Sequence, residues 1–203
     1  MACVTRPITM RLFLAIELPD LVRQHLAELT KDRRLENHVT SAWGADFPIS
    51  VTIPQNLHVT LKFLSEVDES AVGPLREALA SVETAPPARV FVAHAELLPP
   101  RGPVRVVSVG LDGDVGRVAR LQRDVEAACA EHGFPAERRA YLPHVTLARA
   151  RSPLPPDVRD GLQAYLDRLL PGPPFDVNGF ALFESKLGAG PPRYTPVARF
   201  GGP

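Results

Sequence analysis

The chain has 203 residues, of which 45% are hydrophobic and 23% charged, and its formal net charge is zero. This composition excludes a disordered charged tail, which has low hydrophobicity and a large net charge, and a collagen-like or low-complexity chain, which needs a Gly or Pro period. It also argues against sequence-independent coating of nucleic acid, which depends on many Lys and Arg contacts to phosphate. The length suits one domain or two small lobes.

The start of the chain and the cysteines indicate where the protein resides. Residues 1–9 show no periodic pattern, and we expect a disordered extension there. The apolar run that follows ends at Glu17, so it is too short for a signal peptide or a membrane span. Cys3 and Cys129 are too few for a disulfide framework and lack zinc-binding spacing. Together these features predict a reduced, cytoplasmic protein without membrane attachment.

In chain order, apolar runs of strand character alternate with stretches of helical spacing, and proline-rich clusters separate them. The predicted strands lie at 11–18, 57–64, 89–98, 104–111, 144–148, 175–184 and 194–200. The predicted helices lie at 20–34, 71–82, 114–132 and 157–170. This alternation predicts an α+β or α/β fold.

The tetrapeptide His-Val-Thr-Leu occurs twice, at 58–61 and again 86 residues later at 144–147. A strand and a helix precede each copy, and a helix and a strand follow it, so the surrounding pattern repeats as well. We infer two sequence repeats, about 10–98 and 99–203, within one bilobal domain that covers 10–203. A pseudo-twofold arrangement would face the two motifs across a shared cleft. Whether the repeats exchange terminal strands is not decided by the sequence.

The repeated motif carries the residue types of acid–base chemistry. Because alternate side chains of a strand share a face, we expect His58, Thr60 and Lys62 on one polar face, and His144 with Thr146 on its counterpart. Two imidazoles and two hydroxyls supply the base, the acid and the oxyanion donors that in-line displacement at phosphorus needs, without a metal ion. A metal site is not indicated, because two histidines provide only two ligands.

The alternative interpretation is structural. A single His-Val-Thr-Leu is more often a half-buried strand with a surface histidine, and duplication without catalytic use stays open. The repetition of both His and Thr nevertheless favours a function, because packing alone would accept any β-forming residue at those polar positions.

Three segments carry a resemblance to a known family: MRLFLAIELP at 10–19, NLHVTLKFLSE at 56–66 and PHVTLAR at 143–149. They resemble the 2H phosphoesterase superfamily and, more narrowly, the RNA 2′,3′-cyclic phosphodiesterases, also called the 2′-5′ RNA ligase family. The resemblance implies an α+β, bilobal duplicated fold with two mainly antiparallel sheets, flanked by helices around a central cleft. It also implies cofactor-free, metal-independent hydrolysis of RNA 2′,3′-cyclic phosphate ends to 2′-phosphate ends, sometimes with reversible 2′-5′ ligation.

The resemblance assigns His58 and His144 as catalytic residues and Thr60, Thr146 and Arg149 as phosphate-binding residues. Strict alternation would place Arg149 on the face of Val145, so a bulge or a strand end must turn it toward phosphate. The sequence departs from the family at Ser65, where glycine is usual, and at Val51, where tryptophan is frequent.

Further candidate contacts with RNA are Lys62 on the motif strand, Arg138 and Arg139 in a local basic cluster, and Tyr194 as a stacking platform. For Phe13 and Phe63 we expect burial in the core, with base stacking as the alternative.

The predicted partners are RNA ends or small cyclic nucleotides, and we expect a monomer. The alternatives are a noncatalytic module that binds nucleotides or RNA ends in the same cleft, and a related enzyme acting on a small cyclic nucleotide or a 2′-5′ oligonucleotide. The enzyme is favoured because binding alone would not require both imidazoles.

Overall fold

The computed structural model describes residues 9–30, 35, 49–154 and 158–202. Its strands are β1 (Thr9–Glu17), β2 (Ile49–Val51), β3 (His58–Asp68), β4 (Ala88–Leu98), β5 (Val104–Gly113), β6 (His144–Leu154), β7 (Phe175–Val177), β8 (Gly179–Lys186) and β9 (Arg193–Gly201). Its helices are α1 (Asp20–Thr30), the 3-10 helix η2 (Pro54–Asn56), α3 (Glu69–Ala80), α4 (Val115–Ala130) and α5 (Val158–Asp167).

The predicted elements are confirmed in kind and order. The predicted strand at 175–184 is divided into β7 and β8, and β2 was not predicted. Thr9, expected in the terminal extension, is the first residue of β1, while residues 1–8 lie outside the described part of the chain. No helix among the described residues is long and apolar enough to cross a membrane.

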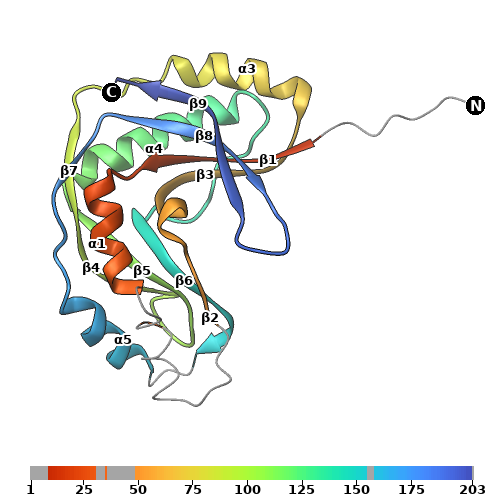
Figure 1. Cartoon of the computed structure of the whole chain (residues 1–203). Coiled ribbons are helices and arrows are strands. Elements are labelled where there is room, and N and C mark those ends of the chain that lie inside the picture. The colour runs from red at the N-terminus through yellow and green to blue at the C-terminus, as the bar shows by residue number, and fades with distance from the viewer. Residues whose placement is uncertain (1–8, 31–34, 36–48, 155–157, 203) are drawn as a thin grey trace, which may run out of the picture.

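The strands form one curved, antiparallel sheet of nine strands in the order β7-β4-β5-β6-β3-β1-β8-β9, with β2 added beside β6 (Figure 1). This arrangement confirms the α+β class. The sequence led us to expect two sheets. The structure joins the two halves into one, because β3 and β6 pair at Val59 and Val145.

The two repeats exchange their last strands. β4 belongs to the first repeat but pairs with β5 of the second, and β8 of the second repeat pairs with β1 of the first. The halves of the sheet are therefore β3-β1-β8-β9 and β6-β5-β4-β7, which correspond strand by strand under a pseudo-twofold operation. Helix α3 packs on the first half and α5 on the second, while α4 contacts both β3 and β4. Tyr165 of α5 donates a hydrogen bond to the Leu29 carbonyl of α1.

The apolar faces predicted from helical spacing form the core. Val22, Leu26 and Leu29 of α1 are buried, as is Cys129 on α4, where burial raises the pKa of the thiol to about 11. Asp114 precedes α4 as predicted for an N-cap. Its carboxylate accepts a hydrogen bond from the Arg89 backbone N–H of β4 and makes none to its own helix.

Candidate active site

The two His-Val-Thr-Leu motifs meet where β3 and β6 pair. Val59 lies opposite Val145, and both side chains are fully buried. Because neighbouring residues of a strand point to opposite faces, the other face of the sheet carries the polar residues of both motifs. These are His58, Thr60, His144 and Thr146, and we call this side of the sheet the motif face.

The antiparallel register determines how these four side chains are arranged. Around the Val59–Val145 pair, the histidine of each motif lies opposite the threonine of the other. The two histidines are then diagonal neighbours, for which the typical separation is about 7–8 Å. The structure thus brings together the four residues that the sequence singled out.

Both imidazoles are oriented in the same way by the backbone. His58 Nδ1 lies 2.7 Å from the Asn56 carbonyl oxygen, and His144 Nδ1 lies 2.7 Å from the Leu142 carbonyl oxygen. A carbonyl only accepts hydrogen bonds, so Nδ1 carries the proton in each ring and Nε2 is left for chemistry. His58 Nε2 lies 3.0 Å from the Thr60 hydroxyl oxygen.

The pKa of His58 is lowered from its ordinary value of 6.5 to about 4. Burial is the largest cause; the Asn56 carbonyl opposes it, whereas the charges of Arg149 and His144 add to it. The rings of Phe13 and Tyr194 pack against His58, with centroids 5.0 and 5.5 Å away. His58 is therefore neutral at pH 7 and able to accept a proton.

A β-bulge follows the threonine of each motif. In β3, Thr60 pairs with Ala15 and Lys62 with Leu14, so Leu61 is an extra residue. In β6, Thr146 pairs with Ser108 and Ala148 with Val107, so Leu147 is an extra residue. A bulge reverses the alternation of side chains beyond it. Arg149 consequently turns to the motif face, as the resemblance to the family requires.

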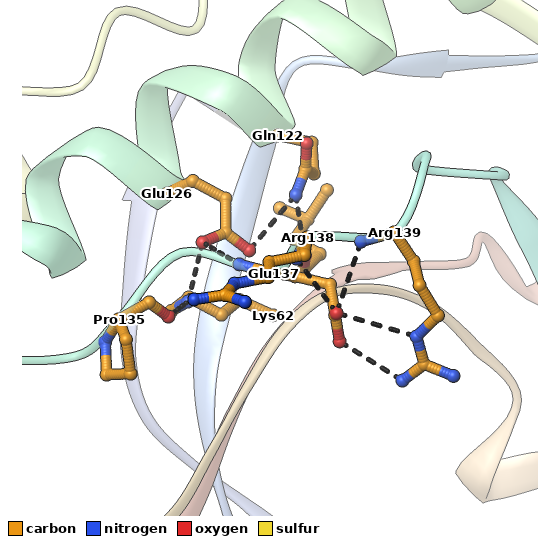
Figure 2. Close-up of polar contacts among 8 residues, drawn as sticks. Lys62, Gln122, Glu126, Pro135, Glu137, Arg138 and Arg139 are labelled. Carbon is orange, nitrogen blue, oxygen red and sulfur yellow. Dashed lines mark hydrogen bonds and ion pairs between the residues drawn. The ribbon is translucent and has the colours of Figure 1, made fainter.

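The bulge at Leu61 of β3 makes our expectation for Lys62 wrong. Lys62 points to the opposite side of the sheet and is only 6% exposed. Its Nζ donates to Glu126 Oε2 of α4 at 2.6 Å and to the Pro135 carbonyl at 2.8 Å (Figure 2). Glu126 also accepts from Gln122 Nε2 and from the Glu137 backbone N–H. Lys62 therefore anchors α4 and the segment before His144, and it is not available to RNA.

That segment, residues 134–143, also contacts the first motif directly. The Tyr141 hydroxyl donates to the Thr60 carbonyl oxygen at 3.1 Å. Burial raises the pKa of Tyr141, which keeps the phenol protonated as a donor. Arg138 and Arg139 are exposed on this segment, and Arg139 pairs with Glu137 at 3.1 Å (Figure 2). The Glu137 carboxylate thus offsets part of the predicted basic cluster.

An aromatic cluster lies beside His58. Phe13 contacts four rings, at centroid distances of 5.0 Å to His58, 6.2 Å to Phe63, 5.3 Å to Phe183 and 4.8 Å to Tyr194. Phe13 is buried as expected, but the expectation for Phe63 was wrong. The bulge turns this ring to the motif face, where it is 63% exposed.

Two cations lie close to the aromatic cluster. Burial raises the pKa of the Tyr194 hydroxyl, while the charges of Arg149 and Arg11 oppose this rise. Arg149 therefore acts on both Tyr194 and His58, which places its charge near both side chains. Arg11 was not predicted, because an isolated arginine at the start of a strand carries no signal in the sequence.

A duplicated antiparallel sheet with one His-x-Thr-x motif on each central strand is the architecture of the 2H phosphoesterases. A family profile described as LigT-like phosphoesterase matches residues 16–107 and 109–194. The chain belongs to this family, and it is an enzyme of the phosphoesterase class.

Individual relatives agree with this assignment. A Thermus thermophilus protein named RNA 2′,3′-cyclic phosphodiesterase is 32% identical over 201 residues, which cover 94% of this chain and 89% of that protein. A crystal structure of a protein from Thermus thermophilus superimposes with a TM-score of 0.70 at 28% identity, covering 95% and 97% of the two chains. Escherichia coli LigT, crystallised with 3′-AMP, has the same fold, with a TM-score of 0.68 at 24% identity, covering 96% of this chain and 98% of that chain.

Proposed function

We propose that this enzyme hydrolyses RNA 2′,3′-cyclic phosphate ends to 2′-phosphate ends by acid–base catalysis between His58 and His144. The observation that carries the proposal is the Val59–Val145 pairing, which sets one imidazole and one threonine from each repeat on a single face of the sheet. The name of the Thermus thermophilus relative, RNA 2′,3′-cyclic phosphodiesterase, supports the choice of substrate.

In this mechanism His58 is the base. Its lowered pKa keeps Nε2 unprotonated at neutral pH, so it takes a proton from the attacking water. As the new O–P bond forms, the bond between phosphorus and the 3′ oxygen breaks. His144 enters this step as an imidazolium, with its Nδ1–H bound to the Leu142 carbonyl, and its Nε2–H protonates the departing oxygen. The attacking and leaving oxygens lie on opposite sides of phosphorus, which requires two separate groups. In 2′-5′ ligation a 5′-hydroxyl takes the place of the attacking water and the two histidines keep these roles. They exchange roles in the reverse reaction, in which the 3′-hydroxyl attacks the 2′-5′ linkage and the 5′ oxygen leaves.

The remaining residues of the motif face hold the substrate. Thr60, Thr146 and Arg149 donate hydrogen bonds to the nonbridging oxygens, where negative charge develops. Tyr194, which packs on the buried Phe13, and the exposed Phe63 offer a stacking surface for a base next to His58. Exposed Arg138 and Arg139 are positioned to attract the RNA backbone. The ligands are accordingly RNA ends or small cyclic nucleotides.

The test is to incubate the purified protein with an oligonucleotide that ends in a 2′,3′-cyclic phosphate and to map the product. We expect a 2′-phosphate end, and an unchanged rate in excess EDTA. A 3′-phosphate product would reverse the assignment of the leaving oxygen. Binding of the oligonucleotide without any product would indicate the noncatalytic module.

A further inference from the structure

The strand exchange brings a second pair of polar residues to the motif face of the second half. His94 of β4 pairs with Gly110, which in turn pairs with His144. Glu96 pairs with Ser108, which pairs with Thr146. Paired residues of neighbouring strands share a face. Two rows of paired residues thus lead across the sheet from the motif residues His144 and Thr146 to His94 and Glu96.

The imidazole of His94 leans across β5 toward His144. A Cβ atom added to Gly110 would lie 2.3 Å from His94 Nε2 and 2.7 Å from its Cε1, so the ring occupies the space that any other side chain at this position would fill. His94 Nε2 lies 3.6 Å from Glu96 Oε2. The two side chains keep 50% and 23% of their surface exposed, so a ligand can reach both.

In the part of the chain that the structure describes, the first half of the sheet has no such unneutralised carboxylate in the corresponding rows. The row of Thr60 continues with Ala15 and Ala181, so alanines replace Ser108 and Glu96. The row of His58 continues with Glu17, whose carboxylate is paired with Arg199. The aromatic cluster of Phe13 and Tyr194 is on that side instead. A feature needed for the duplicated fold would be present in both halves. The difference therefore indicates that the two sides of the motif face contact different parts of a substrate.

The chemistry of Glu96 defines what it binds. A carboxylate accepts hydrogen bonds and repels phosphate, so its ligand is a hydrogen-bond donor. Among the described residues, the ion pair that involves Glu96 is with His94 alone, so no arginine or lysine neutralises it. Along the sugar–phosphate backbone of RNA the hydrogen-bond donors are ribose hydroxyls, which carboxylates also bind in dinucleotide-binding proteins, and the terminal base lies on the aromatic side.

We propose that Glu96, assisted by His94, binds the ribose 2′-hydroxyl of the nucleotide that precedes the reacting end, and so selects RNA over DNA at that position. This inference rests on the proposed function. The 2′-hydroxyl in question takes no part in bond making or breaking, because the cyclic phosphate is on the next sugar. Replacing it by hydrogen therefore tests binding specificity without removing the chemistry.

The experiment uses two oligonucleotides with the same ribose 2′,3′-cyclic phosphate end, one with ribose and one with 2′-deoxyribose at the preceding nucleotide. For the wild-type protein we expect kcat/KM to be about 10–100-fold higher for the ribose substrate, the range typical of a hydrogen bond to a charged group. In Glu96→Ala the ratio should fall to near one, through loss of rate on the ribose substrate only. Glu96→Gln, which keeps the shape, should show a smaller ratio than wild type.

Three further variants separate this role from a general effect on structure. Gly110→Ala should displace His94 and reduce the ratio in the same direction as His94→Ala. Glu77→Ala, which removes an exposed carboxylate on α3, should leave the ratio unchanged. The far-ultraviolet circular dichroism of each variant verifies the fold.

Three results would overturn the inference. They are a ribose-to-deoxyribose ratio of kcat/KM near one for wild type, a ratio that does not change in Glu96→Ala, and a preference that depends on the base of the preceding nucleotide but not on its sugar. No turnover of either substrate by wild type would instead reject the proposed function.

Discussion

Val59 pairs with Val145, the residue that holds the same place in the second repeat. The pseudo-twofold axis of the molecule passes between these two buried valines, so the histidine and threonine on either side are brought into equivalent positions. Val59 and Val145 form the one residue pair between β3 and β6 among the described residues. The Tyr141–Thr60 hydrogen bond and the Lys62–Glu126 ion pair add contacts between β3 and the second repeat. The spacing of the proposed catalytic groups therefore depends on residues outside the motif face.

The buried Lys62–Glu126 pair supplies the first prediction. Lys62→Met leaves the Glu126 carboxylate buried without its cation, and breaking such a pair typically costs about 3–5 kcal/mol. Replacing both residues, as in Lys62→Met with Glu126→Leu, should restore much of the lost free energy of unfolding. Urea denaturation of the single and double variants measures both effects. An unchanged unfolding midpoint in Lys62→Met would show that the pair contributes nothing to stability.

Ser65 supplies a prediction of increased stability. Its φ of 62° is in the left-handed region, which glycine adopts without strain and other residues adopt at a cost of about 1–2 kcal/mol. The side chain is exposed, so Ser65→Gly loses no packing. We expect a gain of about 0.5–1 kcal/mol in the free energy of unfolding, since glycine also makes the unfolded chain more flexible. Ser152→Gly, at an exposed site without positive φ, is the control and should not stabilise.

The lowered pKa of His58 predicts an unusual pH profile. If His58 is the base, it loses activity only when protonated, so the acid limb of kcat/KM should lie near pH 4 and well below the ordinary value of 6.5. Between these values the unfolded chain binds more protons than the folded one, so the free energy of unfolding also falls as the pH is lowered through this window. Initial rates taken before unfolding separate the two effects. An acid limb at about pH 6.5 would contradict this environment for His58.

Arg149 connects substrate binding with that pH profile. Arg149→Met removes a donor to the nonbridging oxygens, for which losses of about 10²–10³-fold in turnover are typical. It also removes a positive charge that lowers the pKa of His58, so the acid limb should move to higher pH. Arg76→Met, on the exposed surface of α3, should change neither quantity. A slower variant with an unmoved limb would place Arg149 away from His58.

The sequence predicted those parts of the site that repeat. His58, Thr60, His144 and Thr146 are visible because two copies of one motif carry them, and the helices and strands follow from the spacing of apolar residues. The orientation of Lys62 and Phe63 was not predictable, since a bulge at Leu61 leaves no trace in an alternating pattern and reverses every side chain beyond it.

The pairing of strands from different repeats could not be predicted from the sequence either. Nothing in the sequence around His94 or Glu96 links them to His144, because their proximity arises only when β4 leaves its own repeat and pairs with β5. The turn to positive φ at Ser65 was hidden for a different reason. The residue there is not the glycine that would have signalled it.

The most direct test of two imidazoles acting on one phosphorus is the turnover of a cyclic-phosphate-ended oligonucleotide by His58→Ala, His144→Ala and the double variant. Each single variant should be slower by about 10²–10⁴-fold. Because the two groups act in one step, the double variant should be about as slow as the slower single variant, well short of the product of both losses. A rate close to that of wild type in either single variant would contradict the account.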